Sequence, residues 1–75
     1  MIYPSQIGEA LKIRINGKTE EIEKKSLSEV IIGSGLDPAR VAVELNGKII
    51  PRTDFKSTML KDGDSLEIVH FVGGG

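Results

Sequence analysis

The sequence SLEIVHFVGGG, at residues 65–75, combines an alternating strand pattern with a run of glycines. Leu66 and Ile68 are two positions apart, which predicts a strand with both side chains on the core face of a sheet. Val69 and Phe71 then share the opposite face. Since an exposed apolar patch tends to mark a contact site, this one strand predicts a core on one side and a binding surface on the other.

The last four residues, Val72, Gly73, Gly74 and Gly75, follow this strand with no polar linker. Glycine has no side chain to pack and loses the most backbone entropy on ordering, so we expect a flexible tail. At about 3.3–3.6 Å per extended residue, this tail reaches about 13–14 Å from the domain. We therefore predict that Gly73, Gly74 and Gly75 enter the active site of another protein, which modifies the free carboxylate of Gly75. The alternative is an inert frayed end.

The composition excludes several classes of function. The chain has no cysteine, which excludes disulfides, thiolate metal sites and cysteine nucleophiles. Its 10 basic and 11 acidic residues give a net charge of −1, so charge implies neither a nucleic acid nor an anionic membrane as partner. No apolar run approaches the roughly 20 residues that span a bilayer, and no targeting signal is visible. We expect a cytoplasmic protein that binds no metal.

Two charged sites in the sequence are interpreted as surface residues and not as binding sites. Asp62 and Asp64 resemble a fragment of a calcium loop, but the remaining ligands and the final glutamate are absent. We interpret both as turn residues. We interpret Arg52 as a solvated loop charge, the alternative being a salt bridge to a partner protein.

Two Asn-Gly pairs, at Asn16-Gly17 and Asn46-Gly47, predict two β-hairpins, because both residues tolerate a positive φ. The segments around them alternate between apolar and polar residues, as half-buried strands do. The predicted strands span residues 11–16, 18–23, 41–46, 48–50 and 65–71. Their predicted core residues are Leu11, Ile13, Ile15, Ile22, Val41, Val43, Leu45, Leu66 and Ile68.

A short helix is predicted between the two hairpins. Ser26 and Glu29 have the spacing of a capping box, in which each side chain accepts a hydrogen bond from the backbone of the other. Leu27, Val30 and Ile31 then form one apolar stripe on the helix. Either of the glycines at positions 33 and 35 can provide the left-handed cap that ends it. After the second hairpin, Phe55 and Leu60 are expected to anchor an irregular segment to the core.

One amphipathic helix and several strands with one apolar face favour a single sheet with the helix packed across it. We predict an α+β, ubiquitin-like β-grasp fold with a mixed four- to five-stranded sheet, in which the first and last strands lie parallel at the centre. The domain is expected over residues 11–71. Residues 1–10 are interpreted as a leader or an extra edge segment, and residues 72–75 as the tail.

Three segments resemble the ThiS family, the sulfur carriers of bacterial thiamine biosynthesis. They are VAVELNGKIIPR at residues 41–52, LKDGDSL at residues 60–66 and EIVHFVGGG at residues 67–75. The likeness extends from about Leu11 to Gly75. The combination of these segments at this chain length is specific, whereas a terminal Gly-Gly alone is not.

The resemblance implies a function in making the thiazole ring of thiamine. An adenylating enzyme of the ubiquitin-activating type would use ATP and Mg²⁺ to adenylate the Gly75 carboxylate. A cysteine desulfurase system would supply the sulfur that converts the adenylate into a thiocarboxylate, and thiazole synthase would receive that sulfur. The chain would be a protein co-substrate, with no catalytic residue and no bound cofactor of its own.

The partner-docking face is predicted at Val69, Phe71 and Val72, the apolar residues beside the tail. We expect this face to bind both the adenylating enzyme and thiazole synthase. The alternative is that residues 1–10 cover it. His70 is interpreted as a residue at the end of the strand, not as a ligand or a base.

Other functions remain open on the residues alone. The same fold and the same terminal glycines occur in the small subunit of molybdopterin synthase and in ubiquitin-like modifiers, and only the partner separates these from a thiamine sulfur carrier. A function of another class, a passive protein-binding module with an inert tail, predicts that the terminal carboxylate is never modified.

Overall fold

The computed structural model describes residues 10–71. In this part of the chain the elements are β1 (Ala10–Ile15), β2 (Lys18–Glu23), α1 (Leu27–Gly33), η2 (Pro38–Arg40), β3 (Val41–Leu45), β4 (Lys48–Ile50), η3 (Arg52–Asp54) and β5 (Ser65–His70), where η marks a 3-10 helix. Every predicted strand and the predicted helix are present, and β5 ends one residue earlier than predicted. The predicted tail and the first nine residues of the predicted leader lie outside the described residues.

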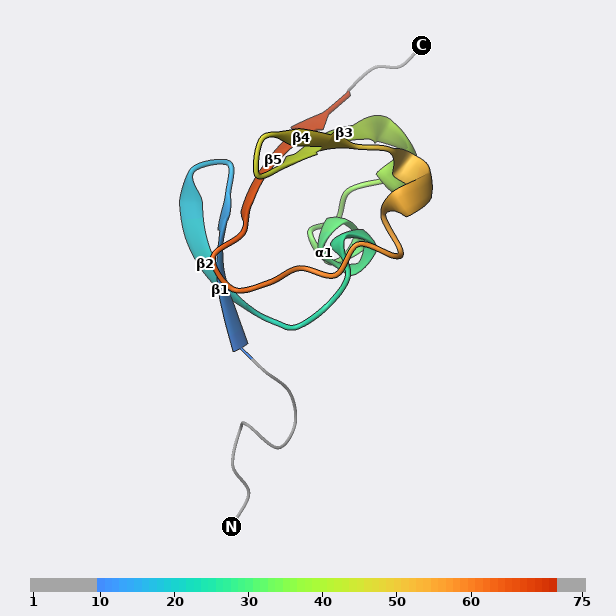
Figure 1. Ribbon diagram of the computed structural model, residues 1–75. Helices are drawn as coiled ribbons and strands as arrows, with labels where there is room; N and C mark the ends of the chain where they lie inside the picture. Colours follow the sequence, from blue (N-terminus) through green and yellow to red (C-terminus); the bar gives the residue numbers. More distant parts are fainter. Residues whose placement is uncertain (1–9, 72–75) are drawn as a thin grey trace.

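The strands form one mixed five-stranded sheet in the order β2-β1-β5-β3-β4. β1 and β5 are parallel, with Arg14 opposite Ser65 and Ile15 opposite Leu66. The other neighbouring strands are antiparallel. The first and last strands therefore lie side by side at the centre of the sheet, as predicted (Figure 1). This confirms the α+β β-grasp arrangement.

Both Asn-Gly pairs form tight hairpin turns. The φ angles are 51° at Asn16, 82° at Gly17, 52° at Asn46 and 86° at Gly47. Two consecutive positive φ values are typical of a type I′ turn, whose twist matches that of the strands it joins. Each two-residue turn therefore fixes the register of its hairpin, and with it the face on which every side chain lies.

The helix α1 begins and ends where its capping residues predict. The hydroxyl oxygen of Ser26 accepts a hydrogen bond from the amide of Glu29 (3.2 Å), and the Glu29 carboxylate accepts one from the amide of Ser26 (2.8 Å). At the other end Gly35 has φ 80°, and the amide of Leu36 donates to the carbonyl oxygen of Ile31 (3.2 Å). This is a Schellman motif, so the later of the two candidate glycines provides the left-handed cap.

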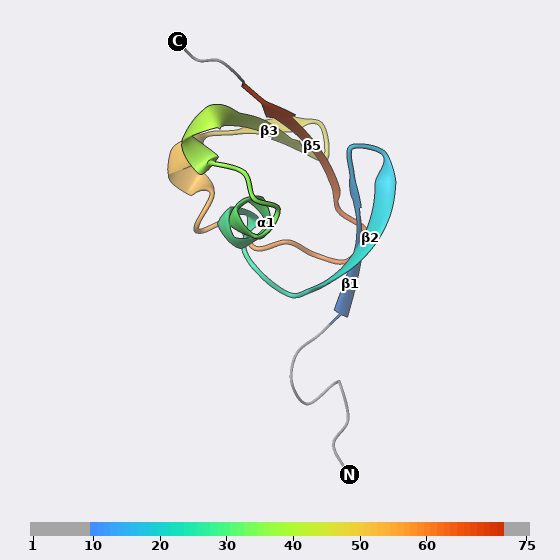
Figure 2. The same cartoon turned by 180° about the vertical axis from the view of Figure 1, so that it is seen from behind.

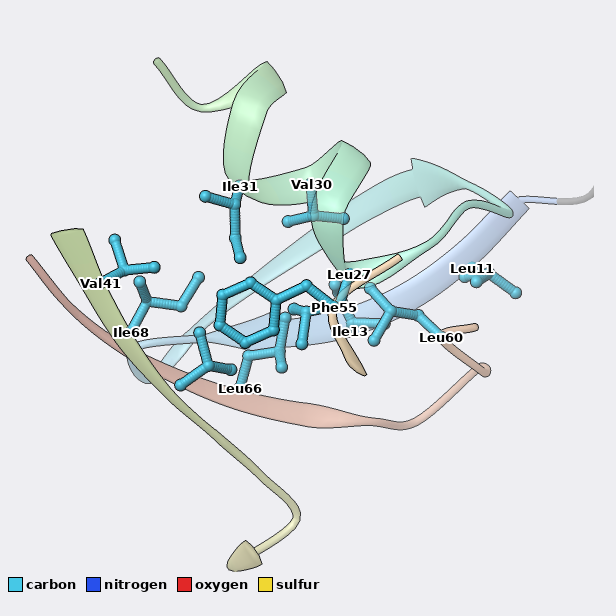
Figure 3. Close-up of a cluster of buried hydrophobic side chains, with 11 residues drawn as sticks. Leu11, Ile13, Leu27, Val30, Ile31, Val41, Phe55, Leu60, Leu66 and Ile68 are labelled. Carbon is cyan, nitrogen blue, oxygen red and sulfur yellow. The ribbon is translucent and has the colours of Figure 1, made fainter. Parts of the chain in front are cut away.

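The core lies between α1 and one face of the sheet (Figures 2 and 3). The 11 buried hydrophobic residues are all residues that the sequence placed in the core: Leu11, Ile13, Leu27, Val30, Ile31, Val41, Val43, Phe55, Leu60, Leu66 and Ile68. Ile15, Ile22 and Leu45, which were also expected there, are partly buried and pack against this cluster. The opposite face of the sheet has no helix over it in the described part of the chain.

Candidate functional site

The strand that leads to the tail, β5, is held along both edges. On one edge it pairs with β3 from Leu66, opposite Leu45, to His70, opposite Val41. On the other edge it pairs with β1 only at its start. The last bond of that ladder joins the amide of Asn16 to the carbonyl oxygen of Leu66 (2.8 Å). Beyond this point, the backbone of β1 turns away from β5.

The asparagines of the two hairpin turns extend this pairing with their side chains. Oδ1 of Asn16 accepts a hydrogen bond from the amide of Ile68 (2.7 Å), and its Nδ2 donates to the carbonyl oxygen of Ile68 (3.2 Å). Oδ1 of Asn46 accepts from the amide of Ser65 (2.9 Å), and its Nδ2 donates to Asp64 (2.9 Å). Because one side chain holds the start of β5 and the other a point near its end, the strand is fixed along most of its length.

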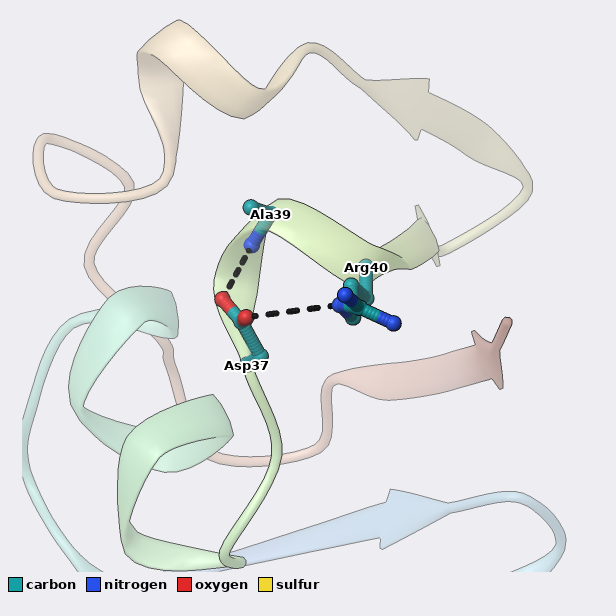
Figure 4. A network of polar contacts seen from close by, with 3 residues as sticks. All are labelled: Asp37, Ala39 and Arg40. Atoms are coloured by element: carbon teal, nitrogen blue, oxygen red, sulfur yellow. Dashed lines mark hydrogen bonds and ion pairs between the residues drawn. The ribbon is translucent and has the colours of Figure 1, made fainter. Parts of the chain in front are cut away.

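The short helix η2 holds the first residue after β5. Asp37 accepts a hydrogen bond from the amide of Ala39 (2.9 Å), and its other carboxylate oxygen lies 3.8 Å from Nε of Arg40 (Figure 4). The carbonyl oxygen of Arg40 in turn accepts a hydrogen bond from the amide of Phe71 (2.8 Å). No helix or strand was predicted for residues 38–40. The 3-10 turn that forms there fixes the backbone directly before the predicted tail.

The face of the sheet opposite α1 carries exposed apolar side chains. Val69 is 57% exposed, Phe71 is 54% exposed, and Ile49 on β4 is 70% exposed. Ala42 on β3 pairs directly with Val69 and extends the apolar surface toward β4. We call Ala42, Ile49, Val69 and Phe71 the sheet-face patch. It adjoins the end of β5, so a protein that covers it is close to the predicted tail.

Two glutamates border the sheet-face patch. Glu44 on β3 lies directly opposite Glu67 on β5, and a shallow hollow on this face is lined by both of them together with Ile49 and Val69. Like charges directly opposite each other on a sheet are destabilising. Within residues 10–71, neither carboxylate has an ion-pair partner. An apolar centre with an acidic border favours a partner surface that is apolar and basic.

The predicted site residues divide between the described and undescribed parts of the chain. Val72, Gly73, Gly74 and Gly75 lie outside the described residues, so their predicted roles stay predictions. The two described members of the predicted docking face are both exposed on the open face of the sheet. His70 is an exposed residue at the end of β5, as expected.

Sequence reasoning missed Ile49 and Ala42 as members of the patch. For Ile49 a signal was available, because the two-residue turn pairs Leu45 with Lys48 and so turns the side chain of Ile49 away from the core. For Ala42 no such signal existed. Its position beside Val69 depends on the register between β3 and β5, which no tight turn connects.

The other candidate sites have structural roles. Asp62 accepts a hydrogen bond from the amide of Lys12 (2.7 Å), and Asp64 accepts one from the amide of Lys61 (2.8 Å), which confirms both as turn residues. Among the residues that the structure describes, no cluster of three or more histidine, aspartate or glutamate side chains is placed to hold a metal ion. No helix in residues 10–71 has the length and apolar character needed to cross a membrane.

Comparisons with known sequences give one consistent result. Residues 6–75 match the ThiS family. The chain is 35% identical over 65 residues to the sulfur carrier protein ThiS of Bacillus subtilis, and this match covers 84% of the chain and 98% of that protein. It is also 39% identical over 66 residues to a thiazole synthase of Paramagnetospirillum magneticum, covering 87% of the chain but only 20% of the synthase. The chain thus spans about a fifth of the length of the thiazole synthases that it matches.

The fold gives the same relationship. The crystal structure of the thiamine biosynthesis protein (ThiS) from Geobacter metallireducens superimposes with a TM-score of 0.74 at 33% sequence identity. The match covers 87% of this chain and 100% of that protein.

Proposed function

The chain belongs to the ThiS family, and from this we propose that it is a sulfur carrier in the synthesis of the thiazole ring of thiamine. The observation that carries the proposal is the combination at the end of β5. A strand held on both edges ends beside an exposed apolar patch and leads directly into the sequence Val72-Gly73-Gly74-Gly75. This is what a protein needs in order to present its terminal carboxylate to the active sites of others.

The reacting group is the carboxylate of Gly75. A carboxylate is a poor electrophile, and adenylation by ATP turns one of its oxygens into part of a good leaving group, with pyrophosphate released. A sulfur nucleophile that originates from cysteine through a desulfurase then attacks the acyl carbon. A C–S bond forms, the C–O bond to AMP breaks, and AMP leaves with that oxygen. Because a desulfurase delivers this sulfur as a persulfide, the first product is an acyl disulfide. A thiol such as cysteine then reduces its S–S bond and becomes part of a disulfide, which leaves a thiocarboxylate at Gly75.

In this proposal the catalytic groups belong to the partners. The adenylating enzyme, of the ubiquitin-activating type, holds ATP and the Mg²⁺ that neutralises its phosphates. The carrier contributes recognition through the sheet-face patch and access through the narrow glycine tail. It is therefore a co-substrate. The proposal sets these events in the cytoplasm, where ATP and cysteine are available.

Thiazole synthase is the proposed acceptor of the sulfur. The synthase of Paramagnetospirillum magneticum contains, within a fifth of its length, a segment similar to most of this chain. Joining two interacting domains in one polypeptide raises their effective concentration toward each other. This similarity supports an interaction between the separate carrier and a synthase.

Intact-protein mass spectrometry tests the proposal. The full chain is incubated with ATP, Mg²⁺, cysteine, a cysteine desulfurase and the adenylating enzyme, and we expect a mass increase equal to the replacement of one oxygen by one sulfur. Omission of ATP should prevent it, and deletion of Gly75 should prevent it as well. An unchanged mass in the complete mixture would contradict the proposal and favour a binding module with an inert tail.

A second step identifies the pathway. The thiocarboxylated carrier is supplied in turn to thiazole synthase and to the large subunit of molybdopterin synthase. We expect sulfur to leave the carrier with thiazole synthase alone. Transfer only in the molybdopterin reaction would keep the sulfur-carrier chemistry but overturn the assignment to thiamine.

A further inference from the structure

A second apolar surface lies on the side of the sheet that α1 covers. It is an open hollow of about 390 Å³ where α1, η2 and η3 meet. These three elements lie together on the side of the domain away from the β1–β2 hairpin (Figures 1 and 2). We call this surface the helix-side hollow, and its lining includes Ser28, Ile32, Pro38, Arg52, Phe55 and Lys56.

The greater part of the exposed lining of the hollow is apolar. Ile32 points out of the last turn of α1 and is 59% exposed, whereas Phe55 is only 3% exposed and forms part of the floor. Pro38, at the start of η2, lines the hollow on another side. An aliphatic side chain placed here would bury the exposed part of Ile32, which the fold itself leaves in water.

Most polar side chains of the hollow are donors without a partner among residues 10–71. The exception is Thr53, whose hydroxyl donates to the carboxylate of Asp54 (3.5 Å). Ser28 is only 6% exposed, and its amide donates to the carbonyl oxygen of Phe55 (3.0 Å). Its hydroxyl lines the hollow with no hydrogen-bond partner among residues 10–71. Arg52 and Lys56 are exposed, and neither forms an ion pair within that part of the chain. No carboxylate of the described residues lines the hollow, and Asp54, which lies between the two cations in the sequence, forms no ion pair with either of them.

We propose that the helix-side hollow binds an acidic, leucine-type segment of a partner protein. The aliphatic side chain lies against Ile32 and Phe55. A neighbouring carboxylate lies between Arg52 and Lys56, and it accepts a hydrogen bond from the hydroxyl of Ser28. Charge-assisted hydrogen bonds to a carboxylate are the strong ones, and two unpaired cations beside an apolar floor complement this combination of groups.

This surface is separate from the one used in the proposed function. The sheet-face patch and the helix-side hollow lie on opposite sides of the sheet, so a protein held at the hollow leaves the patch accessible. Because the hollow is small compared with a standard protein interface, the contact is weak and transient. It therefore suits a partner that binds and leaves quickly, including at times when the tail is inside another active site.

Titration of the ¹⁵N-labelled full chain with the peptide acetyl-Leu-Glu-Leu-Glu-amide tests the proposal. We expect fast-exchange shifts of the backbone amides of Ser28, Ile32 and Lys56, with no shift at Ile49 or Val69. The shifts should decrease as salt is added, since they depend on charge. Acetyl-Leu-Lys-Leu-Lys-amide and inorganic phosphate are the controls, and neither should reproduce them.

Charge reversal sharpens the test. The double variant Arg52→Glu and Lys56→Glu should bind the acidic peptide at least about tenfold more weakly than the unchanged protein. The matched variant Lys18→Glu and Lys61→Glu changes the net charge equally at positions outside the hollow and should bind normally. Both should keep the spectrum of a folded domain, because all four side chains are exposed.

Several results would overturn the proposal. These are no shift with the acidic peptide, shifts centred on the sheet-face patch, and binding that both double variants weaken equally. The same shifts with phosphate alone would also overturn it, because they would show an anion site without any use of the apolar floor. None of these outcomes bears on sulfur loading at Gly75, which is measured separately by mass.

Discussion

The two faces of β5 carry similar side chains in opposite environments. Leu66 is 0% and Ile68 is 8% exposed beneath α1, whereas on the other face Val69 is 57% and Phe71 is 54% exposed. Full burial of one such side chain stabilises a fold by about 1.5–3 kcal/mol. Val69 and Phe71, which stay exposed on the open face, do not contribute this stabilisation. The covered face therefore stabilises the fold, whereas the open face remains available for the binding that we propose.

Leu66→Ala should have the largest effect, because it breaks the covered face at its centre. Removal of a fully buried leucine side chain leaves a cavity as well as losing burial, and costs about 2–5 kcal/mol. Small domains have only about 5–15 kcal/mol of stability in total. Chemical denaturation followed by circular dichroism measures this loss. Val69→Ala on the same strand is the control and should change the free energy of unfolding by no more than about 0.5 kcal/mol. Equal losses would mean that the two faces are not distinct.

Phe71→Asp should break the open face instead. It places a charge in the sheet-face patch, and we expect the affinity for the adenylating enzyme to fall by about 2 kcal/mol, or about 30-fold. The free energy of unfolding should change by less than about 0.5 kcal/mol, since the side chain is exposed. Calorimetric binding and the adenylation rate measure the first effect. Thr19→Asp, on β2 near the far edge of the sheet, is the control. Adenylation at the normal rate would place the docking surface elsewhere.

Asn16→Gly should have an intermediate effect on stability, because it loosens β5, which carries side chains on both faces of the sheet. Glycine keeps the positive φ of the turn (51°) but removes both side-chain bonds to Ile68. At about 0.5–1.5 kcal/mol for each net hydrogen bond, we expect a loss of about 1–3 kcal/mol for the two bonds. Hydrogen exchange should become faster at the Ile68 amide.

Asn46→Gly is the matched control for this substitution. It removes the bond to Ser65 at the start of β5 and leaves the end next to the tail unchanged. If the position of the tail depends on how the end of β5 is held, thiocarboxylation should slow more in Asn16→Gly than in Asn46→Gly. Equal rates would limit Asn16 to a role in stability.

The sequence predicted those parts of the fold that short-range chemistry determines. The alternation of residues 11–16, the two Asn-Gly turns and the capping box of Ser26 and Glu29 each act over a few residues, and each is present in the structure. The core followed from these, because a strand with a fixed register and a helix with a fixed stripe have only one way to bury both apolar faces.

The features that were not predicted join residues far apart in the sequence. The side chain of Asn16 forms two hydrogen bonds with the backbone of Ile68, which is 52 residues away in the sequence. The pairing of Glu44 with Glu67 depends on the register between β3 and β5. The helix-side hollow likewise arises where α1, η2 and η3 meet. No local rule specifies such contacts. For this reason the sequence identified part of the sheet-face patch but not its acidic border or the helix-side hollow.

Glu29→Gln should have the smallest effect, and it concerns the covered side alone. The pKa of the Glu29 carboxyl is lowered, mainly by the hydrogen bond from the backbone amide of Ser26 and to a smaller extent by a hydrogen bond with the Ser26 side chain. Since this pKa is lower in the folded than in the unfolded chain, the carboxylate stabilises the fold above the unfolded-state pKa. That contribution is lost as the pH falls through the lowered folded-state pKa. Denaturation at a series of acidic pH values should therefore show a smaller loss of stability in Glu29→Gln than in the unchanged protein. If the two proteins lose stability equally as the pH falls, the capping box does not contribute to the pH dependence. Binding at the sheet-face patch should be the same in both proteins.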